Sequence, residues 1–248
     1  MRYVGTERVT RMKRICFDAI YFEMDMIVKQ RLCEELVRLV EAEDHLEFWY
    51  LGCHTAVESL SLQIICELQR AYPAKRIEIV KVVDPVKRAQ QNCDSNAEFL
   101  QTMFNEDPDG FPIGLEKREI LAPWIEGKCE AYDNRFSAHH RKVWRWALEQ
   151  CDILIAYNYD NIPCTLTNDL KRIRKQNLIE VITVYNPEQY QLINERIGIL
   201  KEREQVIIRG LWEGRTYQSL ADELGVTHNR VQQLASRAGR KLYFGKKK

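Results

Sequence analysis

Apolar positions along residues 14–195 follow two alternating patterns. Short continuous runs rich in β-branched and aromatic residues alternate with longer segments in which apolar residues recur every three or four positions. The short runs predict buried strands, and the longer segments predict helices that pack by one face. The expected strands are Ile15–Phe22, Phe48–Leu51, Ile77–Val83, Ile153–Tyr159 and Ile179–Tyr185, and the expected helices are Ile27–Ala42, Ala56–Ala71, Ser137–Gln150 and Thr165–Lys175.

This alternation predicts the fold class. Strands joined by helices run parallel, and helices cover both faces of such a sheet. With right-handed crossovers, we expect an α/β fold: a Rossmann-like parallel sheet domain at residues 14–190. Residues 85–136 interrupt the rhythm with breakers such as Pro85, Pro108 and Pro123. We therefore expect an insertion or lid there rather than core.

Residues 196–245 have a different pattern, which predicts a small all-α helix-turn-helix domain. Thr216 and Thr227 stand where N-caps are needed, and Gly225 can adopt the left-handed turn between two short helices. The three helices are expected at 199–212, at 217–224 and from 228 to about 242. Apolar or small residues occupy the positions that lock a helix-turn-helix: Leu220, Ala221, Leu224, Gly225, Val226, Val231 and Leu234.

Charge separates the two parts of the chain. The formal net charge is +1, but the segment from Arg196 to Lys248 carries 12 Lys and Arg against 5 Asp and Glu. A basic end on an acidic body indicates an anionic partner for that end. Together with the helix spacing, this favours double-stranded DNA over a plain protein-interaction module.

The segment Ile199–Leu242, and especially Val226–Leu242, resembles region 4 of sigma-70-type RNA polymerase sigma factors. The resemblance implies that the third helix reads DNA, with His228, Asn229 and Gln232 at the base-reading positions. Asn and Gln suit bidentate pairing with adenine, and His can donate to N7 of guanine. The other residues expected at the DNA interface are Thr216, Thr227, Arg230, Gln233, Arg237, Arg240 and Lys241, the basic ones as phosphate contacts.

No upstream segment resembles the sigma region that melts promoters, so we expect a regulator or a polymerase-contacting accessory protein. Residues 14–185 resemble the YpsA-like branch of the SLOG superfamily of Rossmannoid nucleotide-binding domains, through Tyr50–Leu60, Glu67–Pro73 and Cys151–Tyr157. This resemblance implies a nucleotide-type ligand beyond the carboxyl ends of the strands. The expected ligand-binding residues are Gly52, His54, Thr55, Glu58, Asp84, Tyr157, Asn158 and Thr165.

Cys53 and Ala56 stand where the turn of that family has glycines, and each added Cβ limits close approach to a phosphate. These departures argue against catalysis and weaken phosphate binding, and no catalytic residue is assigned. The eight cysteines form no C-x-x-C pair, which favours structural thiols over a metal site. No apolar run is long enough to cross a bilayer, and the first residues lack the apolar stretch of a secretory signal. We therefore expect a cytoplasmic protein without a membrane partner.

The sequence thus predicts a transcription-regulator-like, DNA-binding protein whose α/β domain senses a nucleotide-type ligand or mediates oligomerisation. RNA polymerase and a second copy of the chain are further candidate partners. Three alternatives stay open: a nucleotide-processing enzyme with a DNA-binding tail, a single-stranded DNA-binding protein, and a module that only contacts another protein.

Overall fold

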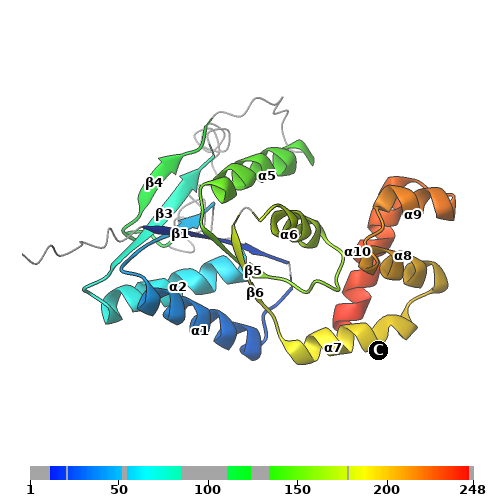
Figure 1. Ribbon diagram of the computed structural model, residues 1–248, viewed down its shortest axis with the longest axis horizontal. Helices are drawn as coiled ribbons and strands as arrows, with labels where there is room; N and C mark the ends of the chain where they lie inside the picture. Colours follow the sequence, from blue (N-terminus) through cyan, green and yellow to red (C-terminus); the bar gives the residue numbers. More distant parts are fainter. Residues whose placement is uncertain are drawn as a thin grey trace, which may run out of the picture.

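The computed structural model describes residues 12–20, 22–51, 55–84, 111–123, 134–177 and 179–245, without the side chains of 134–141. Figure 1 shows a sheet between two layers of helices, followed by a helical C-terminal part. The strands are β1 Lys13–Ala19, β2 His45–Tyr50, β3 Arg76–Val83, β4 Arg118–Leu121, β5 Ile153–Tyr157 and β6 Glu180–Val184. The helices are α1 Met26–Ala42, α2 Ala56–Ala71, α5 Asn134–Glu149, α6 Thr165–Gln176, α7 Pro187–Glu195, the 3-10 turn η1 Arg196–Ile199, α8 Glu202–Trp212, α9 Tyr217–Leu224 and α10 His228–Phe244.

The sheet has the order β4-β3-β2-β1-β5-β6, and every neighbouring pair is parallel. Helices α1 and α2 cover one face and α5 and α6 cover the other (Figure 1). The winding reverses between β1 and β5, so the carboxyl ends of these two strands border the crevice where open α/β sheets bind ligands. The expected α/β class with a helical C-terminal domain is confirmed.

Local sequence explains why these elements form where they do. The inner strands β1, β2 and β5 contribute apolar side chains to the core, and Ile15, Phe48 and Leu154 on them are fully buried. Asp25 caps α1 by accepting a hydrogen bond from the backbone N–H of Val28 at 2.9 Å. Within the described ranges, no helix is both long and apolar enough to span a membrane.

The edge strand β4 lies inside the segment that the sequence pattern assigned to an insertion. It pairs with β3 from Val80 opposite Arg118 to Val83 opposite Leu121. Only two of its four residues are apolar, and Leu121 is 58% exposed, so the strand has no apolar run that the pattern could detect. Phe111 from the same segment is buried in the core, so at least this part of 85–136 belongs to the sheet domain.

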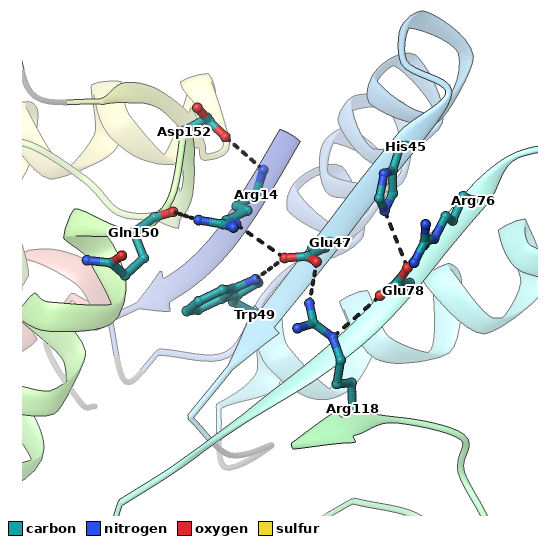
Figure 2. Close-up of polar contacts among 9 residues, drawn as sticks. All are labelled: Arg14, His45, Glu47, Trp49, Arg76, Glu78, Arg118, Gln150 and Asp152. Atoms are coloured by element: carbon teal, nitrogen blue, oxygen red, sulfur yellow. Dashed lines mark hydrogen bonds and ion pairs between the residues drawn. The ribbon is translucent and has the colours of Figure 1, made fainter. Parts of the chain in front are cut away.

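A buried carboxylate joins the amino-terminal halves of three strands (Figure 2). Glu47 on β2 is 3% exposed and accepts a hydrogen bond from the indole N–H of Trp49 at 3.0 Å. Its carboxylate also pairs with Arg118 on β4 and, at 3.3 Å, with Nε of Arg14 on β1. Two guanidinium groups therefore compensate for the removal of this charge from water.

Glu78 on β3 extends the network toward the sheet edge (Figure 2). Its carboxylate pairs with Arg76, with Nε of Arg118 at 3.5 Å and with Nε2 of His45 at 3.3 Å. Burial raises the pKa of Glu78, but hydrogen bonds from Arg76 and His45 and the charge of Arg118 hold it below its ordinary value. Ligand atoms of His45, Glu47 and Glu78 lie within 4.8 Å of one another. Since guanidinium groups already neutralise the two carboxylates, the cluster is suited to an ion-pair network rather than to a metal ion.

Removal of the central carboxylate should destabilise the sheet. We expect Glu47→Ala to lower the free energy of unfolding by about 3 kcal/mol, because Arg14 loses its ion-pair partner, the indole N–H of Trp49 loses its acceptor and Arg118 keeps only Glu78. Glu47→Gln, which keeps an acceptor for Trp49, should fall between the wild type and Glu47→Ala. Urea denaturation measures these differences, with Glu180→Ala, which removes an exposed carboxylate from the edge strand β6, as the control. Similar small losses in Glu47→Ala and Glu180→Ala would contradict this role.

Candidate nucleic-acid interface

The caps and turn of the C-terminal helices lie at the residues that the sequence indicated. The hydroxyl of Thr216 accepts from the backbone N–H of Ser219 at 3.1 Å and begins α9. Gly225 ends α9 with φ of 62°, and the hydroxyl of Thr227 then accepts from the N–H of Arg230 at 3.3 Å. These contacts confirm the expected helix-turn-helix geometry. The first helix begins later than expected, at Glu202 rather than near 199, because η1 precedes it.

A small apolar core holds the three helices together. Of the residues expected to lock the motif, all except Gly225, which forms the turn, belong to this core or pack against it, and Ile207 and Leu211 of α8 contribute as well. Gly210 on α8 lies so close to α9 that an added Cβ would meet Cδ2 of Leu220 at 2.7 Å. The residues of this core are Ile207, Leu211, Tyr217, Leu220, Ala221, Leu224, Val226, Val231, Leu234 and Ala235.

Most of the residues expected to contact DNA are exposed to solvent. Their side chains are exposed at Thr216, Thr227, Asn229, Arg230, Gln232, Gln233, Arg237 and Arg240. His228 is half-buried, and its ring meets that of Tyr217 edge-on at 5.8 Å. The first turns of α10 therefore present amide side chains flanked by cationic ones, which is the chemistry that reads base edges and holds phosphates.

Lys241 makes an internal contact that the sequence did not indicate. Its ammonium donates to both oxygens of the Glu204 carboxylate, at 2.7 and 2.8 Å. Glu204 is 3% exposed and also accepts from the backbone N–H of Lys201 at 3.1 Å, while Nε of Arg237 lies 4.0 Å away. This ion pair fastens α10 to the start of α8. The role of Lys241 as a phosphate contact stays a prediction.

Two opposing effects act on the pKa of Glu204. Burial raises it, but the hydrogen bonds from Lys241 and from the Lys201 backbone, with the charges of Lys241 and Arg237, hold it below its ordinary value. Because the folded-state pKa is lowered, the ionised carboxylate stabilises the fold above its unfolded-state pKa. That contribution is lost as the pH falls through the folded-state pKa.

Glu204→Gln should therefore destabilise the protein in a pH-dependent way. The variant should unfold more easily than the wild type at about pH 7, and the difference should shrink as the pH falls below the ordinary glutamate pKa of about 4.3 toward the lower folded-state pKa. Denaturation at several pH values measures the difference, and Glu202→Gln, an exposed carboxylate on the same helix, is the control. A difference of constant size across this range would contradict the ion-pair role.

Comparison with known proteins agrees with this geometry. Residues 197–243 match the family model described as Sigma-70, region 4. A comparison with curated proteins gave no match. The helical C-terminal part of the chain therefore matches sigma-70 region 4 and is joined to a Rossmann-like α/β domain.

The residues expected to bind a ligand in the α/β domain have other contacts as well. Thr55 and Glu58 form a capping box at the start of α2, in which each backbone N–H donates to the other side chain, at 2.9 and 3.2 Å. Asp84 is buried directly after β3. Gly52 and His54 lie outside the described residues.

The remaining expected ligand residues lie near β5 and α6. Asn158 is fully buried and its side-chain carbonyl accepts from the hydroxyl of Thr167 at 3.2 Å, while Thr165 is exposed at the first position of α6. Tyr157 is also fully buried, and its hydroxyl contacts the hydroxyl of Tyr243 at 3.1 Å. Burial is the main cause that raises the pKa of Tyr157 above its ordinary range. A ligand role for these residues stays a prediction.

The contact between Tyr157 and Tyr243 is part of a docking of α10 on the sheet. The ring of Tyr243 stacks on Phe22 with centroids 4.2 Å apart, and its hydroxyl donates to the backbone carbonyl of Glu23 at 3.0 Å. A second contact lies at the last residue of α8, where the indole N–H of Trp212 donates to the backbone carbonyl of Asn161 at 2.8 Å. The helix-turn-helix therefore rests on the carboxyl edge of the sheet, beside the end of β5.

Proposed function

We propose that this protein is a DNA-binding, transcription-regulator-like protein that reads duplex DNA with the first turns of α10. The observation that carries the proposal is the exposed group of Asn229, Gln232 and Gln233 on a helix held as a region 4 helix-turn-helix. Amide side chains in the major groove can pair bidentately with adenine, and His228 can donate to guanine. Arg230 and Arg237, which flank them, are suited to phosphates on either side of the groove.

The α/β domain is proposed to control this reading, by sensing a nucleotide-type ligand or by mediating oligomerisation. The docking of Tyr243 beside Tyr157 supports control from this domain, because a change at the carboxyl edge of the sheet reaches α10 directly. A paired arrangement would place two reading helices at a fixed half-site spacing. Contact with RNA polymerase without DNA reading is an outcome of the first experiment below.

Selection from a random duplex pool tests sequence reading by the full chain. We expect an enriched motif that is lost in the triple variant His228→Ala, Asn229→Ala, Gln232→Ala, because those side chains supply the contacts to bases. The matched control is Lys29→Ala with Gln30→Ala on the exposed side of α1. Retention without any motif, or a motif unchanged in the triple variant, would contradict the proposed reading. No retention at all would leave the protein-contact role.

The salt dependence of binding tests the phosphate contacts separately. Replacing both Arg230 and Arg237 by Ala should weaken binding by a similar factor on all duplexes and reduce the slope of log affinity against log salt by about 2. Arg38→Ala, a 54% exposed arginine side chain on α1, should leave the slope unchanged. An unchanged slope in the double variant would show that these two arginines do not face the phosphates.

A further inference from the structure

A cavity of about 1040 Å³ lies between the two domains. Its floor is the end of β1 with the residues that follow it, one side is the start of α6, and the other side is the C-terminal half of α10. This place is the reversal point between β1 and β5, where open α/β sheets bind their ligands. Of the expected ligand residues that the structure describes, only Thr165 lines it. The lining therefore differs from the set of residues that the sequence indicated.

We propose that this cavity binds a nucleoside phosphate and that the bound ligand lowers the affinity of the protein for DNA. The binding part depends only on the cavity, and the regulatory part rests on the function proposed above. The chemistry of the lining, taken wall by wall, determines the class of ligand.

The cationic side of the cavity is suited to a phosphate. Arg240 on α10 and Lys201 before α8 both line it and are exposed. Neither side chain has an ion-pair partner in the part of the chain that the structure describes. Lys241 also lines the cavity, but Glu204 already neutralises it. An arginine and a lysine that converge on one hollow provide charge-assisted donors for an anion.

The lining beside these cations is apolar and suited to a flat ring, and Phe244 lies one helical turn after Arg240 on α10. Phe22 and Phe244 meet edge-on with centroids 5.4 Å apart, and Ile20 and Ile162 continue the surface. Phe244 is 59% exposed at the last turn of α10, where an aromatic side chain in water gains from a ring stacked on it. The volume is at the upper end of the range of about 300–1000 Å³ for small-molecule sites, so a ring and a phosphate fit together.

Asp18 supplies a third kind of contact. It stands near the end of β1, lines the cavity and accepts from the backbone N–H of Ala19 at 2.8 Å. A carboxylate has several acceptor positions, so the same group can also accept from sugar hydroxyls. Hydroxyl acceptor, apolar wall and cationic side together match the three parts of a nucleoside phosphate.

The link to DNA runs through Arg240. Arg240 is exposed on the same helix as Asn229 and Gln233. Ser236, which lies between Gln233 and Arg240 in the sequence, also lines the cavity. While the guanidinium of Arg240 binds a ligand phosphate, it cannot also bind a phosphate of the DNA backbone. Because coupling between two sites is reciprocal, DNA and ligand then weaken each other.

Calorimetric titration of the full chain tests the site, with ATP, GTP, their nucleosides and inorganic pyrophosphate as probes. We expect a nucleoside triphosphate to bind at least about tenfold more tightly than its nucleoside and than pyrophosphate. The nucleoside has no phosphate for the cationic side chains, and pyrophosphate has no ring for the apolar lining. Arg240→Ala and Phe244→Ala should each weaken that binding about tenfold or more. Lys175→Ala, an exposed lysine on α6 away from the lining, is the control.

Absence of binding by every probe, or equal affinity in the wild type and both variants, would overturn the site. Retention of the selected duplex is then measured with and without the triphosphate that binds. A fall in DNA affinity of about fivefold or more, abolished in Phe244→Ala, is expected. An unchanged DNA affinity would overturn the regulatory part alone. Triphosphate binding without any duplex retention would support the cavity and contradict the DNA-reading function, so the two failures are distinguishable.

Discussion

The arrangement of the whole molecule depends on one contact, the docking of the last turn of α10 against the carboxyl edge of the sheet. Tyr243 stacks on Phe22 and meets the buried hydroxyl of Tyr157, so the end of a DNA-binding helix stands beside the end of a central strand. The two hydroxyls also lie 3.1 and 3.0 Å from the backbone carbonyl of Glu23, so three polar groups satisfy one another at this contact. Their hydrogen bonds and the ring stacking together hold the end of α10 on the sheet.

The docking is possible because one helix serves two cores. Val231 and Ala235 in its first half belong to the core of the helix-turn-helix, whereas Ala238 and Leu242 in its second half belong to the core of the sheet domain. Gly239 allows the approach, since an added Cβ would stand 3.1 Å from Ile162. The reading helix therefore cannot turn relative to the sheet without repacking both cores, and close packing resists gradual change.

Sequence patterns predicted the features that depend on local chemistry. The central strands, the caps at Thr216 and Thr227 and the turn at Gly225 follow from burial, from side-chain acceptors and from the left-handed conformation, each of which acts within a few residues. The sequence patterns did not predict contacts between segments that are distant along the chain. Nothing in a local pattern indicates that Arg118 on an edge strand pairs with Glu47, or that Lys241 pairs with Glu204 on another helix.

The same limit explains why the expected ligand site and the cavity differ. A resemblance transfers positions along the strands, but the attached helices decide which carboxyl ends remain accessible. Here α10 covers the end of β5 at Tyr157, and Thr55 and Glu58 are occupied in capping α2. The end of β1 and the start of α6 stay open beside Arg240. Because one wall of that opening belongs to the helix-turn-helix, a ligand there contacts the reading helix directly, and no longer chain of intermediate contacts is needed for control.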